Sequence, residues 1–140
     1  MLSIGSDVSI DASLLSHGIT IIAGENARIF EIKSGTTVTL RGLTLTGGHA
    51  NESAYPGNSG GAIYNRGNLT LDRCTVATNS AGSGGAIRNE NILTVESCTL
   101  AYNTSTIDGG AIFSVGTLAV RNSTLAGNTT IGPGGGIDKC

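Results

Sequence analysis

The amino-acid sequence predicts an all-β fold: a right-handed single-stranded parallel β-helix, or β-solenoid, of about five rungs. Three observations predict this fold. A glycine-rich motif recurs every 24 or 25 residues from residue 60 onward. Apolar and polar residues alternate inside each repeat, which is the period of a strand with one buried face. No stretch keeps the period of a helix, and a helix tolerates the 22 glycines of this chain poorly.

The repeated motif is Gly-Gly-Ala-Ile, and it sets the length of one rung. It begins at Gly60, Gly84 and Gly109 and returns at Gly134 as Gly-Gly-Gly-Ile, so the spacings are 24, 25 and 25 residues. A unit this short cannot bury its own apolar face and must stack on its neighbours. Stacked parallel strands place equivalent residues about 4.8 Å apart. The right-handed sense follows from the general preference of parallel crossovers.

A second block keeps the same period and supplies the strands. It occupies residues 69–79, 93–103 and 118–128, and an earlier relative lies at 38–48. Each block holds two pairs of alternating apolar residues separated by a two-residue step, which marks a bend. We therefore predict three short strands per rung, with leucine, valine and isoleucine in inward files of equivalent residues. One of these files contains Leu71, Val95 and Val120. At a turn, a ladder of hydrogen-bonded side-chain amides contains Asn79, Asn103 and Asn128.

The chain is expected to form a single β-helix domain over residues 1–140. Residues 1–35 form an irregular N-terminal rung or cap with strands at 8–10, 19–21 and 30–32, and residues 36–140 form the regular rungs. An inserted loop at 49–59 lengthens one rung to 31 residues against 24 in the next. Because the repeat continues up to Cys140, we expect the chain to be a fragment of a longer protein.

Charge and composition exclude several classes of function. The net charge is −2 and only 13% of residues are charged, so there is no basic stripe for nucleic acid. No apolar run approaches the roughly 18 residues of a transmembrane segment. The first residues lack the basic region and apolar core of a signal peptide, so we expect a leader outside this sequence. Three cysteines without a Cys-x-x-Cys pair predict no metal site, and nothing in the sequence indicates a cofactor.

The glycine motif occurs together with an apolar residue, two further residues and an asparagine, at 76–79, 100–103 and 125–128. This combination resembles the repeats of polymorphic outer-membrane proteins and of the long right-handed parallel β-helix proteins of bacterial surfaces. The resemblance covers residues 19–137. It implies a secreted or surface-displayed passenger, extracellular or at the cell surface or outer membrane, that acts in adhesion or as a structural stalk. It implies no catalytic residues. We expect host or extracellular glycans, or surface proteins, as partners.

An outward column of charged residues offers an alternative function. Stacking places Asp72 and Glu96 one strand spacing apart, close to the ~5–5.5 Å between the carboxyl groups of retaining glycosidases. Polysaccharide enzymes of the pectate-lyase-like fold carry carboxylates on such a face. A carbohydrate-binding or carbohydrate-active β-helix would use the column Arg41, Asp72, Glu96 and Arg121. The other interpretation is a surface charge ladder in which each acid has an arginine neighbour.

A second outward column consists of threonine, as on the flat faces of ice-binding solenoids, so ice binding is a second alternative. Threonine is also a common strand former on solvated sheet faces. The row beside this column has threonine at Thr46 only and continues as alanine, which favours the strand-forming interpretation. The predicted ice-binding column contains Thr44, Thr75, Thr99 and Thr124.

The inserted loop carries three further candidate ligand-binding residues, His49, Glu52 and Tyr55. Insertions in solenoids become loops on one face, and that face is often the binding face. A tolerated surface loop without a ligand is the alternative interpretation.

The cysteines and the ends of the solenoid complete the predictions. Cys74 and Cys98 occupy equivalent inward positions on adjacent rungs, where we expect free buried thiols that act as small apolar side chains. Stacked parallel side chains rarely reach the torsion of a disulfide. Cys140 is a candidate for an intermolecular bridge. The open solenoid ends carry unpaired strand edges, so we expect self-association through them or an ordered N-terminal cap.

Overall fold

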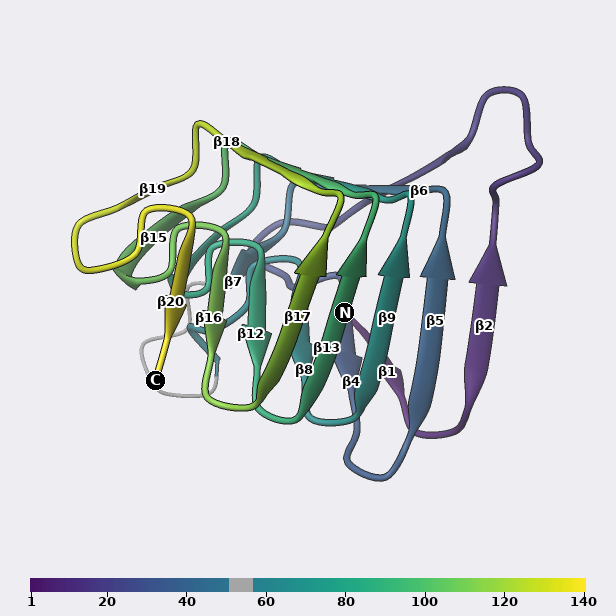
Figure 1. Cartoon of the computed structure of the whole chain (residues 1–140), viewed down its shortest axis with the longest axis horizontal. Helices are drawn as coiled ribbons and strands as arrows, with labels where there is room; N and C mark the ends of the chain where they lie inside the picture. Colours follow the sequence, from purple (N-terminus) through teal and green to yellow (C-terminus); the bar gives the residue numbers. More distant parts are fainter. Residues whose placement is uncertain (51–56) are drawn as a thin grey trace.

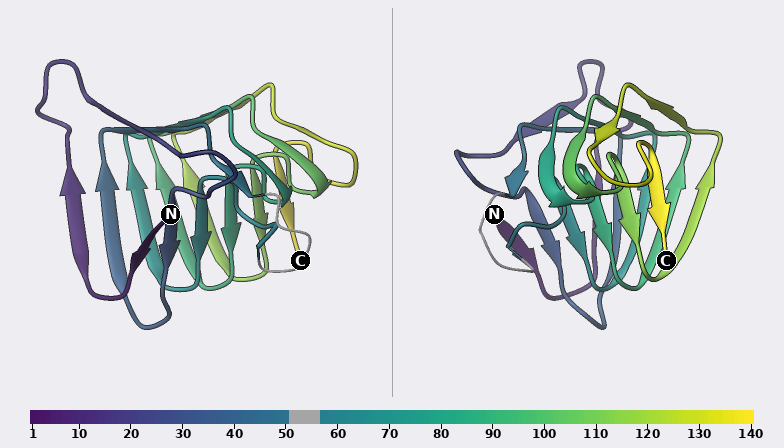
Figure 2. Two further views of the ribbon diagram at one scale, coloured as in Figure 1. Left: turned by 180° about the vertical axis from the view of Figure 1, so that it is seen from behind. Right: turned by 90° about the vertical axis from the view of Figure 1, so that its left-hand side faces the viewer.

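The computed structural model describes residues 1–50 and 57–140, and their backbone winds into a parallel β-helix. Successive laps of the chain lie side by side along the long axis of the molecule (Figure 1). Figure 2 shows the same stack from behind and from the end where β19 and β20 lie. All strand pairs are parallel and form four sheets, which confirms the predicted parallel β-helix of about five rungs. Its right-handed sense stays a prediction.

The four sheets, named here A to D, follow one another around each lap. Sheet A contains β1 (Leu2–Ile4), β4 (Phe30–Ile32), β8 (Ile63–Asn65), β12 (Ile87–Asn89), β16 (Ile112–Ser114) and β20 (Ile137–Lys139). Sheet B contains β2 (Val8–Asp11), β5 (Thr37–Arg41), β9 (Asn68–Asp72), β13 (Ile92–Glu96) and β17 (Thr117–Arg121). Sheet C contains β3 (Ile19–Ile22), β6 (Leu43–Thr46), β10 (Thr75–Ala77), β14 (Thr99–Ala101) and β18 (Thr124–Ala126). Sheet D contains β7 (His49–Ala50), β11 (Ser80–Ser83), β15 (Thr104–Asp108) and β19 (Thr129–Thr130).

A regular rung has four strands, whereas the sequence analysis predicted three. The additional strands are those of sheet D, which are rich in serine and threonine. Their inward side chains are small, with Ala81 and Ser105 both buried. The hydrophobic alternation that identifies the other strands is therefore absent here. The three predicted N-terminal strands are present as β2, β3 and β4.

The core is one continuous set of aliphatic side chains along the axis of the solenoid. Leu71, Val95 and Val120 are register partners on adjacent rungs, which confirms the predicted interior file. Leu71 and Val95 are fully buried, and Val120 on the last rung packs against the same cluster. Burial of such side chains contributes roughly 1.5–3 kcal/mol each. Among the described residues, no helix is long and apolar enough to cross a membrane.

The Gly-Gly pair forms the corner where the chain passes from sheet D to sheet A. Gly84 has a φ of +64°, a left-handed conformation that a side chain would strain. The next residue, Gly85, needs glycine for a different reason. A Cβ there would lie 2.2 Å from the carbonyl oxygen of Gly110 on the following rung. The first glycine of the motif therefore permits the turn, and the second permits the close stacking of rungs.

The two-residue step inside each block is a bend between sheets B and C, as the sequence indicated. The second residue of each step has a positive φ, with values of 51° at Arg73, 53° at Ser97 and 49° at Asn122. The residue that follows the step, Cys74 or Cys98, then turns into the interior. One left-handed residue is thus enough to redirect the strand while keeping the next side chain inside.

Side-chain ladders tie the rungs together inside the solenoid. The Asn79 amide nitrogen donates to the side-chain oxygen of Asn103 at 3.0 Å, and that of Asn103 donates to Asn128 at 2.9 Å. The predicted asparagine ladder is therefore confirmed. A second ladder, which the sequence analysis missed, runs from Asn65 to Asn89 at 2.8 Å and on to Ser114 at 2.9 Å. These three side chains are completely buried.

Candidate functional site

The charged column lies on the outer face of sheet B, on consecutive rungs. Asp72 is the register partner of both Arg41 and Glu96, and Glu96 is the partner of Arg121. The structure adds one member, because Asp11 is the register partner of Arg41 on the first rung. The column therefore reads Asp, Arg, Asp, Glu, Arg from the N-terminal end.

The acids of this column already have polar partners within the chain. Arg41 bridges two of them, at 3.0 Å to Asp72 and 3.9 Å to Asp11. Asp72 also accepts from the Arg73 guanidinium at 3.4 Å, and Glu96 accepts from the Asn122 amide at 2.7 Å. Partners of this kind support a ladder that stabilises the surface rather than a carboxylate pair held ready for a reaction.

The threonine column lies on the outer face of sheet C. Its four predicted members are register partners, and Thr20 on the first rung continues it. The adjacent outward file is Ile22, Thr46, Ala77, Ala101 and Ala126. Only one row of threonine therefore covers this sheet, and ice binding stays a prediction.

Of the three predicted loop residues, only His49 is described; Glu52 and Tyr55 lie outside the described residues. The His49 ring nitrogen Nδ1 hydrogen-bonds the Ser80 hydroxyl on the next rung. Its backbone N–H donates to the Ala27 carbonyl at 3.0 Å. An open hollow of about 490 Å³ lies beside it, lined by Ala23, Gly24, Glu25, Asn26 and Gly47.

Sheet A carries an outward cluster that the sequence analysis did not predict. Tyr64, although outward on β8, is only 3% exposed, and the Arg28 and Arg66 guanidinium groups lie over its ring at 5.1 and 5.4 Å. On the following rungs Arg88 lies 4.3 Å from the centre of the Phe113 ring. Such cation–π contacts contribute about 0.5–2 kcal/mol each.

An ion-pair network continues this cluster toward the first rung. Glu31, the register partner of Tyr64, pairs with Arg66 and with Lys33, the latter at 2.9 Å. Burial alone would raise the pKa of the Glu31 carboxyl, but the hydrogen bonds and positive charges of Lys33 and Arg66 outweigh burial and lower it. The cluster is thus internally paired and holds the outer face of sheet A together.

The two inward cysteines lie where the sequence placed them, as buried free thiols. The Cys74 thiol donates to the Leu40 carbonyl at 3.3 Å, and the Cys98 sulfur accepts from the Cys74 backbone N–H at 3.3 Å. The hydrogen bond with Cys74 and burial both raise the pKa of the Cys98 thiol. Cys140, in contrast, is exposed.

We expect one thiol per folded chain to react rapidly with an alkylating reagent at neutral pH. Cys140 is accessible, whereas Cys74 and Cys98 become reactive only when the solenoid opens. Mass spectrometry after timed alkylation measures this, with a Cys140→Ser variant as the control that should show no rapid reaction. Rapid modification of all three thiols in the folded chain would contradict the buried placement.

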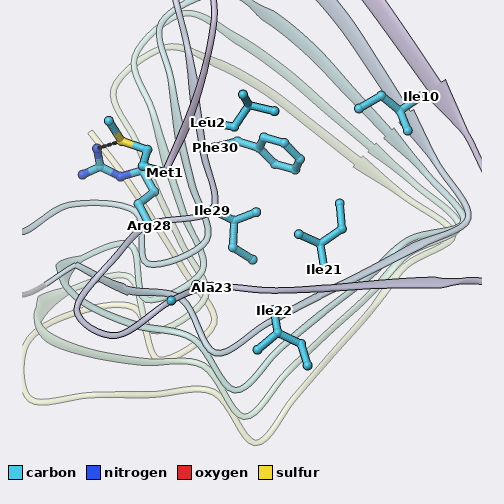
Figure 3. A pocket seen from close by; sticks show the side chains of 10 residues that line it. Met1, Leu2, Ile10, Ile21, Ile22, Ala23, Arg28, Ile29 and Phe30 are labelled. Atoms are coloured by element: carbon cyan, nitrogen blue, oxygen red, sulfur yellow. Dashed lines mark hydrogen bonds between the residues drawn. The ribbon is translucent and has the colours of Figure 1, made fainter.

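An apolar pocket of about 230 Å³ opens at the N-terminal end of the solenoid. Figure 3 shows side chains of the first rung and its connections around it, with Ile10, Ile21 and Phe30 pointing inward from three sheets. Arg28 lies at its margin beside Met1. The Arg28 side chain donates to the backbone carbonyls of Ser59 and Gly60, so its charged group is bound to the wall of the solenoid. The pocket is therefore continuous with the hydrophobic core at the first rung.

Comparison with known proteins identifies one repeat. Residues 97–115 match the model of the Chlamydia polymorphic membrane protein repeat. This segment contains β14, β15 and β16, and with them Asn103 of the ladder and the Gly109-Gly110 corner. No curated protein and no solved structure matches the chain significantly. This part of the chain, with one asparagine of the ladder and one Gly-Gly corner, is therefore similar to a polymorphic membrane protein repeat.

Proposed function

We propose that this chain is a segment of a non-catalytic bacterial surface protein, in which it acts as a rigid stalk or adhesin-type passenger. The observation that carries the proposal is the match of residues 97–115 to a membrane protein repeat whose ladder and corner recur along the solenoid. A surface location outside the cell or at the outer membrane goes with that repeat. Its partners are host or extracellular glycans, or surface proteins.

The distribution of polar side chains supports a mechanical or adhesive role. The acids of the outer column on sheet B are bound by neighbouring arginine or asparagine side chains. The polar groups inside the solenoid connect one rung with the next. These groups hold the rod together, and the large outer faces remain for contact with other molecules.

The adhesin role is tested with beads that carry the 140-residue chain. Such beads should adhere to cultured animal cells more than beads that carry the heat-unfolded chain, because adhesion requires the ordered outer faces. Incubation of the same protein with acidic and neutral polysaccharides should release no product. Equal adhesion of the folded and unfolded forms would contradict an adhesive surface on the solenoid.

A carbohydrate-binding or carbohydrate-active β-helix is the second candidate. The observation that favours it is the in-register pair Asp72 and Glu96 on adjacent rungs between two arginines. Product release from any polysaccharide would support it, provided that the Asp72→Asn/Glu96→Gln double variant loses the activity. Since both residues lie on the outer face of sheet B, this variant keeps the interior files intact and serves as the matched control.

A further inference from the structure

Five stretches of the sequence have the form Asn-x-Ser/Thr, the acceptor pattern for a sugar on the asparagine side chain. They begin at Asn51, Asn68, Asn103, Asn122 and Asn128. Asn51 lies outside the described residues. The pattern arises easily in a chain rich in asparagine and threonine, so the fold has to distinguish the other four stretches from one another.

The alternation of side chains along the backbone sorts these four stretches into two pairs. Because successive side chains point to opposite faces, the asparagine and the hydroxyl residue of one stretch share a face, and the residue between them takes the other. In one pair of stretches the asparagine points inward. Asn103 and Ser105 are buried, and Thr104 between them is exposed. The stretch at Asn128 has the same phase, since only its middle residue, Thr129, is exposed.

The inward asparagines already use their amide nitrogens inside the solenoid. Both hydrogens of the Asn103 amide nitrogen are engaged, one by the Val76 carbonyl and one by the Asn128 side-chain oxygen, both at 2.9 Å. The Asn128 amide nitrogen donates to the Leu100 carbonyl at 2.9 Å. A sugar on either nitrogen would break the ladder and would have to fit between packed rungs.

The stretch at Asn68 has the opposite phase and faces solvent on sheet B. Leu69 is buried, whereas Asn68 on one side of it is exposed and Thr70 on the other is half-buried on the outer face. The Asn68 side-chain oxygen accepts from the Asn91 amide at 3.1 Å, which orients the side chain. Within the part of the chain that the structure describes, no group accepts from the Asn68 amide nitrogen, so this nitrogen is open to reaction.

The stretch at Asn122 shares this outward phase and lies in the bend just after β17 (Figure 1). Ser123 turns inward, where its hydroxyl accepts from the Cys98 backbone N–H at 3.0 Å, while Asn122 and Thr124 are exposed. The Asn122 amide nitrogen donates one hydrogen to Glu96 at 2.7 Å, which leaves the other hydrogen for substitution.

Exposure of Asn122 is a property of the bend itself. Its equivalents on the two preceding rungs are Arg73 and Ser97, which have the same positive φ. Both are exposed, although each of their rungs has a further rung on either side. The outward position of this bend therefore does not depend on which rung it belongs to.

We propose that Asn68 and Asn122 are sites of N-linked glycosylation, at which a glycosyltransferase transfers a hexose from a nucleotide-activated sugar. The amide nitrogen forms a bond with the anomeric carbon of the hexose, and the bond from that carbon to the phosphate breaks. The nucleoside diphosphate leaves, and the nitrogen loses one proton. The product keeps one N–H, with which Asn122 continues to donate to Glu96. The assignment rests on the surface location proposed above, because this acceptor pattern serves secreted proteins.

Incubation of the folded 140-residue chain with uridine diphosphate glucose and a soluble N-glycosyltransferase that recognises Asn-x-Ser/Thr tests the assignment. Peptide mapping by mass spectrometry should locate one hexose on Asn68 and one on Asn122. Modification of Asn103 and Asn128 should be slower by at least about tenfold, because their nitrogens become accessible only when the solenoid opens locally. After heat unfolding, all four asparagines should react.

Two substitutions and their matched controls show that the acceptor pattern is read. Thr70→Ala and Thr124→Ala should each abolish modification at their own site and leave the other site unchanged. The controls Thr94→Ala and Thr99→Ala remove the register partners on a neighbouring rung, which belong to no acceptor pattern. They should leave both sites modified. Circular dichroism of all four variants should keep the β spectrum.

Three results would overturn the assignment. They are a folded chain that lacks hexose at Asn68 or at Asn122, a folded chain in which Asn103 reacts as fast as Asn68, and a Thr70→Ala variant that is still modified at Asn68. The experiment contains no cells, so its failure is distinct from a failure of the adhesion test. Loss of adhesion alone would leave the two acceptor sites in place.

Discussion

Replacing Gly85 by alanine should strongly destabilise the solenoid. The added Cβ would lie 2.2 Å from the Gly110 carbonyl oxygen and 2.6 Å from the carbonyl group of Thr104. Both are backbone atoms held in the hydrogen-bonded stack, so neither can move aside as the end of a flexible side chain could. We expect the free energy of unfolding to fall by about 3 kcal/mol or more, as for other overpacked interior sites. Denaturant unfolding followed by circular dichroism measures the change.

The chain contains a matched control for this substitution. Gly135 occupies the same motif position on the last described rung. A Cβ there has the Asn128 carbonyl oxygen as its nearest neighbour, at 3.5 Å, an ordinary contact distance. Gly135→Ala should therefore change the stability by no more than about 0.5 kcal/mol. Equal losses for the two variants would contradict the role of the second glycine in rung stacking.

Removing the middle member of the asparagine ladder is expected to have a comparable effect. The Asn103 side-chain oxygen accepts from the backbone and side-chain nitrogens of Asn79, at 3.1 and 3.0 Å. Its amide nitrogen donates to the Val76 carbonyl and the Asn128 side chain, both at 2.9 Å. Asn103→Ala leaves these buried groups without partners. Each buried group without a partner costs roughly 1–3 kcal/mol, so we expect the free energy of unfolding to fall by about 3–5 kcal/mol. Denaturant unfolding measures this change.

Asn128→Ala is the control for the ladder. The Asn128 side chain donates to the Leu100 carbonyl and accepts from the Asn103 amide, which are the same kinds of hydrogen bond that Asn103 makes. Asn128 is only half-buried, however, so water can take over these hydrogen bonds when its side chain is removed. The expected loss is about 1 kcal/mol. If Asn103→Ala lowered the free energy of unfolding no more than Asn128→Ala does, burial would not explain how the ladder stabilises the fold.

The period of the sequence was sufficient to predict the rungs, the interior files and the asparagine ladder. Each rung contributes one residue to every file, so the spacing of equivalent residues determines their neighbours. Sheet D was missed because small and polar residues such as Ala81 and Ser105 fill its interior positions. The second ladder was missed because its third member is Ser114 instead of an asparagine.

The candidate surfaces could be predicted only in part. Register alone brings Arg41, Asp72 and Glu96 into one column. It does not give the partners that lie beside the column, such as Asn122 in the bend, which donates to Glu96. The cluster around Tyr64 depends on Arg28, which comes from a connection outside the repeat. Side-chain contacts between repeated and unrepeated segments have no periodic signal in the sequence.

The direction of the inter-rung hydrogen bonds has a mechanical consequence. They lie along the axis of the rod, whereas the covalent backbone runs around it. Tension applied to the two ends therefore loads the bonds at one terminal rung first, and the rod unwinds lap by lap instead of breaking at once. Each lap of 24 or 25 residues would release roughly 80 Å of extended chain at about 3.3–3.6 Å per residue. A rod built in this way lengthens in steps under load and lowers the force on whatever it holds.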